Sequence, residues 1–352
     1  MGAHSFDPPG GSAAPFARHP EAAVPPAGRS RTLWNWARLL GGLLLLALLL
    51  RLVDVRRVAN LLAGADPRFL AAAAGLFVLD RAVMIGKWFP LLRALVPEAR
   101  PGPAIRVCVA SSLAATALPA SVGGEVLRAA ALGRRCGAIA EVSASIAMER
   151  ALGMAATSVL SLAALFLALR ENLPVAALVP WSAAAVLLGT ATVVLPATPW
   201  ARAILNRVTA TRRERAWVGF LRRLWLSYAA YSRRPGLIAG VGLATLVEQC
   251  FPIFIFWCLG RAVGAPVTLL MLAVAAPLAL FTQRIPLTVW GLGISDGALI
   301  YLLGLFGIPA AQALAMSLLG RAIDIVVLAP GVLFWPEMMR GVSARPEGTR
   351  SH

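Results

Sequence analysis

Long apolar runs separated by short arginine-rich segments dominate the pattern of the chain. Six of these runs are at least as long as the roughly 20 residues that a helix needs to cross a bilayer core. They are Leu33–Val53, Phe69–Leu92, Ile139–Arg170, Val175–Pro199, Pro235–Leu259 and Ala310–Trp335. The pattern therefore predicts an all-α polytopic membrane protein with about 6–8 transmembrane helices.

Two stretches interrupt this apolar pattern with proline, glycine and charge. The first, Leu118–Gly153, follows the short apolar run Ala104–Pro119 and contains Pro119, Gly123 and Gly124 as helix-breaking or small residues. Backbone groups that a broken helix leaves free inside a membrane must face protein or water. We therefore expect a broken or re-entrant hairpin here.

The second interrupted stretch, Ile285–Asp324, has the same outline, with Pro286, Gly291 and Gly293 before a long run of small residues. We expect a second broken or re-entrant hairpin at this point. The similar layout indicates a duplication, in which two repeat halves at about 69–199 and 235–335 form one membrane domain, 33–335.

The distribution of arginine predicts the orientation of this domain. Segment 200–234 carries nine arginines against the single acidic residue Glu214, which favours the cytoplasmic side. We expect the Pro- and Gly-rich segment 1–32 to be a disordered cytoplasmic tail and 336–352 to be a second cytoplasmic tail. If one hairpin per half enters the membrane, the halves have inverted topology, as in transporters whose sites lie between repeats.

Charge and composition exclude several function classes. The 33 basic residues exceed the 16 acidic ones, but they lie in loops and at the ends of runs, which indicates contact with an anionic inner leaflet and not with nucleic acid. The three histidines, His4, His19 and His352, all lie in the tails, so a histidine base or ligand within the membrane is excluded. We predict no catalytic residues, no metal and no cofactor.

Ionisable residues within or beside the apolar runs are the candidate site. Each costs about 2.5–3.5 kcal/mol at a helix centre on insertion scales, so each needs a partner or water. We expect substrate contacts from this set: Lys87, Glu125, Arg128, Glu149, Arg150, Asp296, Arg321 and Asp324. Asp80, Arg81, Glu248 and Arg284 share these surroundings.

Two interpretations of these charges remain open at the level of sequence. They form either a network of ion pairs that holds the helices together, or a hydrated groove in which arginines bind a phosphate headgroup bidentately. For Lys87 a third interpretation is a side chain that extends to the cytoplasmic interface beside Trp88. Asp80 and Arg81 are adjacent and point to different faces of a helix, so each is expected to find a partner on another helix.

Four segments together resemble a known family. In chain order they read LPASVGGEVLRAAAL, AMERALG, IPLTVWGLGISDGAL and SLLGRAID. The chain is similar to the lysylphosphatidylglycerol synthase transmembrane (flippase-like) family from about Leu33 to Trp335. Family members usually have Glu where this chain has Asp296, and a basic residue or proline near Ser295.

The resemblance implies a bacterial inner-membrane protein that handles lipid-linked substrates. By motif it carries over Pro119, Gly123, Gly124, Glu125 and Arg128, then Glu149 and Arg150, then Pro286, Gly291, Gly293, Asp296 and Arg321. No segment after Trp335 resembles the soluble aminoacyl-transfer domain of the bifunctional members, so we expect a transporter and not a synthase.

The leading hypothesis is a lipid translocator whose arginines hold the headgroup phosphate while the acyl tails stay in the bilayer. The substrate is then a phospholipid or a lipid-linked sugar. The alternative is a membrane subunit that presents a lipid acceptor to a glycosyl or aminoacyl transferase, with the arginine-rich segment 200–234 as the contact for this cytoplasmic partner. A structural assembly factor is the third hypothesis.

Overall fold

The computed structural model describes residues 53–118, 122–195, 216–282 and 290–343, together with residues 40–42, 44–45, 47–48, 51, 198, 200–201, 203–204, 207 and 288. These residues form thirteen α-helices and no strand. The all-α prediction is therefore confirmed for the described part of the chain. Most of the predicted first run, Leu33–Val53, lies outside the described residues, as do Pro119, Pro286 and Arg284.

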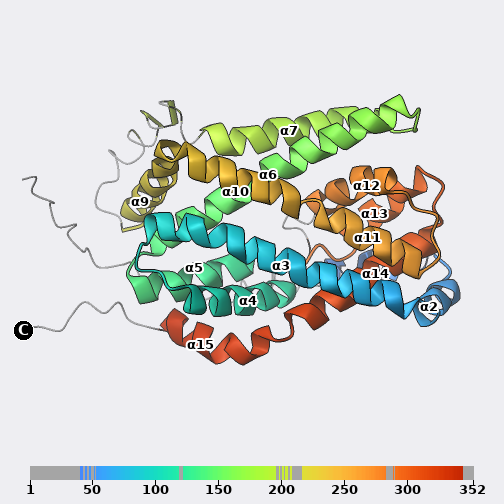
Figure 1. The fold of residues 1–352 in the computed structure, drawn as a ribbon, viewed down its shortest axis with the longest axis horizontal. Helices are drawn as coiled ribbons and strands as arrows, with labels where there is room; N and C mark the ends of the chain where they lie inside the picture. The colour runs from blue at the N-terminus through green and yellow to red at the C-terminus, as the bar shows by residue number, and fades with distance from the viewer. Residues whose placement is uncertain are drawn as a thin grey trace, which may run out of the picture.

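The first half of the fold contains the described helices between residues 55 and 194. Its helices are α2 (Val55–Ala63), α3 (Pro67–Leu95), α4 (Pro101–Ala117), α5 (Val122–Cys136), α6 (Ile139–Arg170) and α7 (Val179–Val194). Helices α4 and α5 pack against each other as a hairpin, and α5 in turn packs on α6. In Figure 1, α3 crosses the middle of the molecule with α4 and α5 beside its C-terminal half.

The second half has a similar order of helices. It contains α9 (Ala216–Ala230), α10 (Pro235–Glu248), α11 (Phe251–Ala262), α12 (Leu269–Thr282), α13 (Ile294–Gly304), α14 (Ala310–Leu328) and α15 (Gly331–Ser343). Here α12 packs on α13, and α13 packs on α14. Helix α3 contacts α10 and α11, so the two halves meet along their first long helices.

Five helical segments of the described chain are long and apolar enough to cross a membrane. They are Pro67–Leu95, Ile139–Arg170, Ala176–Val194, Pro235–Ala262 and Ala310–Leu328. Helices α12 and α13 are apolar but shorter. A multi-pass membrane protein is therefore the architecture that the helices support.

Two predicted runs are divided in the structure. The run Pro235–Leu259 breaks between α10 and α11 at Gln249 and Cys250. Pro252 cannot donate an amide hydrogen bond back into α10, and it lies in the first turn of α11, where proline is well tolerated. The predicted final run, Ala310–Trp335, breaks at Ala329 and Pro330, and α15 then continues to Ser343. Residues 336–343, predicted as tail, are therefore helical.

Helix α15 is clamped against the α4–α5 hairpin. Glu337 accepts hydrogen bonds from Arg106 of α4 at 2.6 Å and from Arg135 of α5 at 3.0 Å. The hydrogen bond from Arg106 is the main cause that lowers the pKa of the Glu337 carboxyl below its ordinary value, and the bond from Arg135 lowers it further. Helices α15 and α5 also approach closely, since a Cβ added at Gly341 would lie 2.7 Å from the carbonyl oxygen of Ala131.

The α4–α5 hairpin follows from its sequence. Helix α4 ends at Ala117, and Leu118 is extended, with φ −88° and ψ 143°, as expected of a residue that precedes proline. Helix α5 begins at Val122 and places Glu125 in its first turn, where the helix dipole favours an acidic side chain. The end of α4 and the start of α5 thus place Glu125 close to the turn of the hairpin.

Candidate functional site

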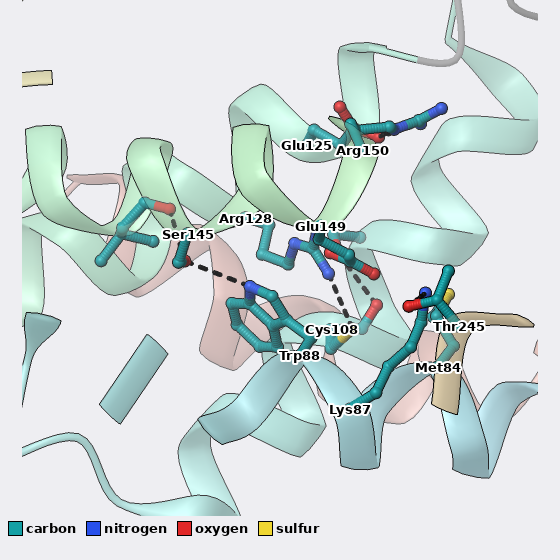
Figure 2. Close-up of polar contacts among 12 residues, drawn as sticks. Met84, Lys87, Trp88, Cys108, Glu125, Arg128, Ser145, Glu149, Arg150 and Thr245 are labelled. Carbon is teal, nitrogen blue, oxygen red and sulfur yellow. Dashed lines mark hydrogen bonds and ion pairs between the residues drawn. The ribbon is translucent and has the colours of Figure 1, made fainter. Parts of the chain in front are cut away.

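The most accessible charge pair of the site joins the start of α5 to α6. Glu125 forms an ion pair with Arg150, and the Arg150 Nε donates to Glu125 Oε1. The Arg150 side chain is 40% exposed, which makes it the most exposed of the predicted site residues that form ion pairs in the described chain. Figure 2 shows this pair set apart from the neighbouring charges around Trp88.

A second pair, Arg128–Glu149, lies buried between α5 and α6. The Arg128 Nη2 donates to Glu149 Oε2 at 2.7 Å, and Arg128 Nη1 contacts the Cys108 sulfur of α4 at 3.3 Å. The guanidinium carbon of Arg128 lies 4.3 Å from the ring centroid of Trp88 on α3, a cation–π contact. Only 6% of the Arg128 side chain is exposed, so this pair ties α3, α4, α5 and α6 together (Figure 2).

Lys87 forms a third pair, one helical position before Trp88. Its Nζ lies 2.5 Å from Glu248 Oε2 and donates to Thr245 Oγ1 at 3.3 Å, so it connects α3 to α10. The Lys87 side chain is only 3% exposed. The interpretation in which Lys87 extends to the interface is therefore wrong, because Glu248 offers an anionic partner inside the bundle.

The second interrupted stretch builds a comparable but more enclosed pair. Asp296, in the first turn of α13, accepts from Arg321 of α14 on both oxygens, at 3.1 Å and 3.0 Å. Asp296 also accepts from Ser317 and from the Gly293 amide, the latter at 2.7 Å. Arg321 additionally donates to Ser295 Oγ at 2.8 Å and to the Trp290 carbonyl oxygen at 3.0 Å.

The backbone before α13 explains the glycines of this stretch. Trp290, Gly291 and Gly293 have φ values of 50°, 66° and 80°. Glycine adopts such left-handed conformations without strain from a Cβ, and two of the three positions are glycine. The turn presents the carbonyl oxygen of Trp290 to the Arg321 guanidinium, whose carbon lies 5.0 Å from the Trp290 ring centroid.

The pairs Glu125–Arg150 and Asp296–Arg321 share one spacing. Glu125 and Arg150 are 25 residues apart, and so are Asp296 and Arg321. In both cases the carboxylate lies in the first turn of a short helix and the arginine lies on the following long helix. Three residues after Asp296 the chain has Leu299, and before Arg321 it has Gly320, so the second half lacks a counterpart of Arg128–Glu149.

The sequence of the chain matches the profile of a known family over nearly the whole membrane region. The profile described as lysylphosphatidylglycerol synthase TM region matches residues 35–331 of the 352-residue chain. The chain belongs to this family. No curated protein and no solved structure matches the chain.

Within this family member, a further charge cluster connects the two halves. Arg81 of α3 donates to Asp324 of α14 at 3.4 Å, and its Nε lies 3.7 Å from Asp80. Arg81 thus finds the interhelical partner that the sequence indicates, although its neighbour Asp80 also lies within ion-pair distance. Asp324, a predicted substrate contact, bonds to a cation of the other half.

The contacts divide the predicted site residues into separate groups. Arg128 and Arg150 pair with carboxylates of the first half, and Arg321 pairs with a carboxylate of the second half. The prediction that all three arginines hold one phosphate therefore stays a prediction. Among the described residues no group of three His, Cys, Asp or Glu side chains could hold a metal ion.

Sequence reasoning misses several members of the site. Trp88, Cys108, Ser295 and Ser317 contact the charged residues but carry no charge of their own. The equal spacing of 25 residues is a signal within the sequence that pairs Glu125 with Arg150 and Asp296 with Arg321. No comparable signal indicates that Trp88 stacks on Arg128, because that contact depends on how the helices are placed in the fold.

Proposed function

We propose that this family member moves an anionic phospholipid or lipid-linked substrate between the leaflets of a bacterial inner membrane. The observation that carries the proposal is the Glu125–Arg150 pair, which combines a carboxylate at a helix start with an arginine whose side chain is 40% exposed. An accessible arginine can exchange its carboxylate for a phosphate.

The exchange has a favourable physical basis. A guanidinium binds carboxylate and phosphate with the same bidentate geometry, so a phosphate can take the place of the Glu125 carboxylate at Arg150. The displaced carboxylate is 19% exposed and can be solvated by water. The amide groups at the start of α5 favour an anion as well. The headgroup would then cross at the hairpin while the acyl tails remain among lipid.

The equal spacing in the two halves supports an alternating cycle. Arg321 is only 11% exposed, whereas Arg150 is 40% exposed. In transporters built from inverted repeats, one half opens as the other closes. We propose that the structure corresponds to a state open at Glu125–Arg150, and that a second state exposes Asp296–Arg321 on the opposite side.

The experiment measures movement of headgroup-labelled lipids in liposomes that contain the purified protein. We expect movement that is selective for anionic headgroups, and we expect Glu125→Gln and Arg128→Ala to abolish it. Glu125→Gln removes the carboxylate that releases the phosphate, and Arg128→Ala removes the guanidinium that bonds Glu149, the neighbour of Arg150. Arg56→Ala, which removes an exposed arginine of α2, is the matched control and should leave movement intact.

The outcome separates the proposal from its alternatives. Loss of movement must be accompanied by a normal elution profile of the detergent-extracted variant; loss of folded protein in every variant would favour a structural network. No movement of any lipid by folded wild-type protein would contradict the proposal. It would favour a membrane subunit that serves a transferase, for which the exposed Arg222 and Arg223 of α9 offer a contact surface.

A further inference from the structure

A groove of about 490 Å³ lies between α3 and α10, apart from the Glu125–Arg150 pair. Its walls include Gly86 and Pro90 of α3 and Gly236, Gly240 and Ala244 of α10, and Lys87 contributes to its lining. This volume is within the range of about 300–1,000 Å³ that is typical of small-molecule sites. Both helices belong to segments that are long and apolar enough to cross a membrane, so a groove between them would open towards lipid.

The glycines of this groove do not pack against the part of the chain that the structure describes. A Cβ added at Gly86, Gly236 or Gly240 would meet no atom within 4 Å. By contrast, a Cβ added at Gly331 would lie 2.9 Å from the carbonyl oxygen of Val109. The glycines of the groove therefore keep a space open on the surface of the bundle instead of allowing two helices to approach.

The groove is apolar, and its one charged member is neutralised. Apart from Lys87, its lining residues are Val, Leu, Ala, Gly and Pro. Lys87 is paired with Glu248 and bonded to Thr245, so it adds no net charge. A neutral apolar channel of this kind suits a hydrocarbon chain and not a headgroup.

Three arginines lie close in sequence to the residues at one end of the groove. Arg93 follows Pro90 by one helical turn on α3, and Arg233 and Arg234 directly precede α10, two or three positions before Gly236. All three arginines are exposed. An amphiphile with a hydrocarbon tail in the groove would place a phosphate within reach of this cationic end.

We propose that the α3–α10 groove binds one acyl chain of an anionic phospholipid, with the phosphate at Arg93, Arg233 and Arg234. The proposal rests on the proposed function in that it takes this lipid as the substrate class. The groove and the Arg128–Trp88 contact lie on the same turn of α3, because Lys87 lines the groove and its neighbour Trp88 stacks on Arg128. The groove would hold the lipid before its headgroup reaches Arg150.

A second copy of the chain is the rival occupant. Gly236, Gly240 and Ala244 follow the small-xxx-small pattern that allows transmembrane helices to pair. A two-fold interface brings the same patch of both copies together. It would therefore oppose the exposed arginines of one copy to those of the other, an arrangement that costs energy. The charge at the groove thus favours an anionic lipid.

The experiment labels the purified full-length protein with a phosphatidylglycerol that carries a photoreactive group on its acyl chain. We expect labelled peptides from 83–90 and 236–244. Gly240→Leu places an apolar side chain in the groove, its added Cβ meets no atom of the described residues within 4 Å, and the variant should reduce labelling several-fold. Gly242→Leu is the matched control: its added Cβ also meets nothing within 4 Å, but Gly242 does not line the groove, so labelling should stay at the wild-type level.

The charge requirement has its own variant. Replacing Arg93 and Arg234 together by Gln should remove the preference for the phosphatidylglycerol probe over a phosphatidylcholine probe with the same photoreactive tail. Equal labelling of wild-type and Gly240→Leu protein would overturn the proposal. So would a change of oligomeric mass in Gly240→Leu with unchanged lipid labelling, which would assign the groove to a second copy.

The two proposals fail in different ways. If Gly240→Leu reduces labelling and Gly242→Leu does not, but wild-type protein moves no lipid, the groove is a lipid site and the translocator proposal is contradicted. If lipid movement is selective and depends on Glu125 while Gly240→Leu neither reduces labelling nor slows movement, the translocator stands and the groove proposal falls.

Discussion

Gly124→Ala is expected to destabilise the protein strongly, because the start of α5 lies directly against α4. A Cβ at position 124 would overlap the carbonyl oxygen of Ser111 and would lie 2.8 Å from the Ala115 Cβ. The overlap is with backbone, so no side-chain rotation relieves it and the two helices must separate. Overpacking of this kind costs about 1–3 kcal/mol or more, and we expect a clear fall in Tm of the detergent-solubilised protein.

A matched variant tests whether the effect belongs to this contact. Gly153 lies in the middle of α6, and a Cβ added there would meet no atom within 4 Å. Gly153→Ala should therefore leave Tm unchanged or raise it slightly, since alanine favours a helix by roughly 1 kcal/mol over glycine. Equal stability of Gly124→Ala and Gly153→Ala would show that α4 and α5 do not approach as closely as described.

The second large effect concerns the buried Lys87–Glu248 pair. Removing one member of a buried ion pair leaves the other charge uncompensated and costs about 3–5 kcal/mol. We expect Lys87→Met and Glu248→Met each to lower Tm strongly. The double variant should recover most of the loss, because two apolar side chains of similar length replace the pair without leaving a buried charge.

The double variant decides between two roles of Lys87. A side chain that reached the membrane interface would tolerate Lys87→Met well, and adding Glu248→Met would not restore anything. Thermal unfolding of the four proteins in the same detergent, followed by size-exclusion chromatography, gives the coupling energy directly. A coupling energy near zero would contradict the buried pair.

Hydropathy predicts the spans well, but it does not predict where they break. The apolar runs that include Phe69–Leu92 and Ile139–Arg170 correspond to α3 and α6. The break at Gln249 and Cys250 escapes prediction because Pro252 is acceptable in the first turn of a helix, and because Glu248 and Gln249 are too few polar residues to interrupt the apolar run. Hydropathy measures the length of an apolar run and not its continuity as a helix.

The sequence predicts which charged residues belong to the candidate site better than it predicts which of them form ion pairs. The charged residues within apolar runs are identifiable from the cost of an uncompensated charge in the membrane. Their partners depend on helix rotation and crossing, which is why Glu149 bonds to Arg128 and not to its neighbour Arg150. The equal 25-residue spacings are the one part of the pairing that the sequence itself contains.

The central claim is that Arg150 exchanges Glu125 for an anionic headgroup, and it predicts opposite effects for two variants of one pair. Binding of a short-chain phosphatidylglycerol to the purified protein is the measurement. Glu125→Gln removes the competing carboxylate and should tighten binding, whereas Arg150→Ala should weaken it, relative to wild type. Unchanged affinity in both folded variants would contradict the claim and leave Glu125–Arg150 as a pair that only holds α5 to α6.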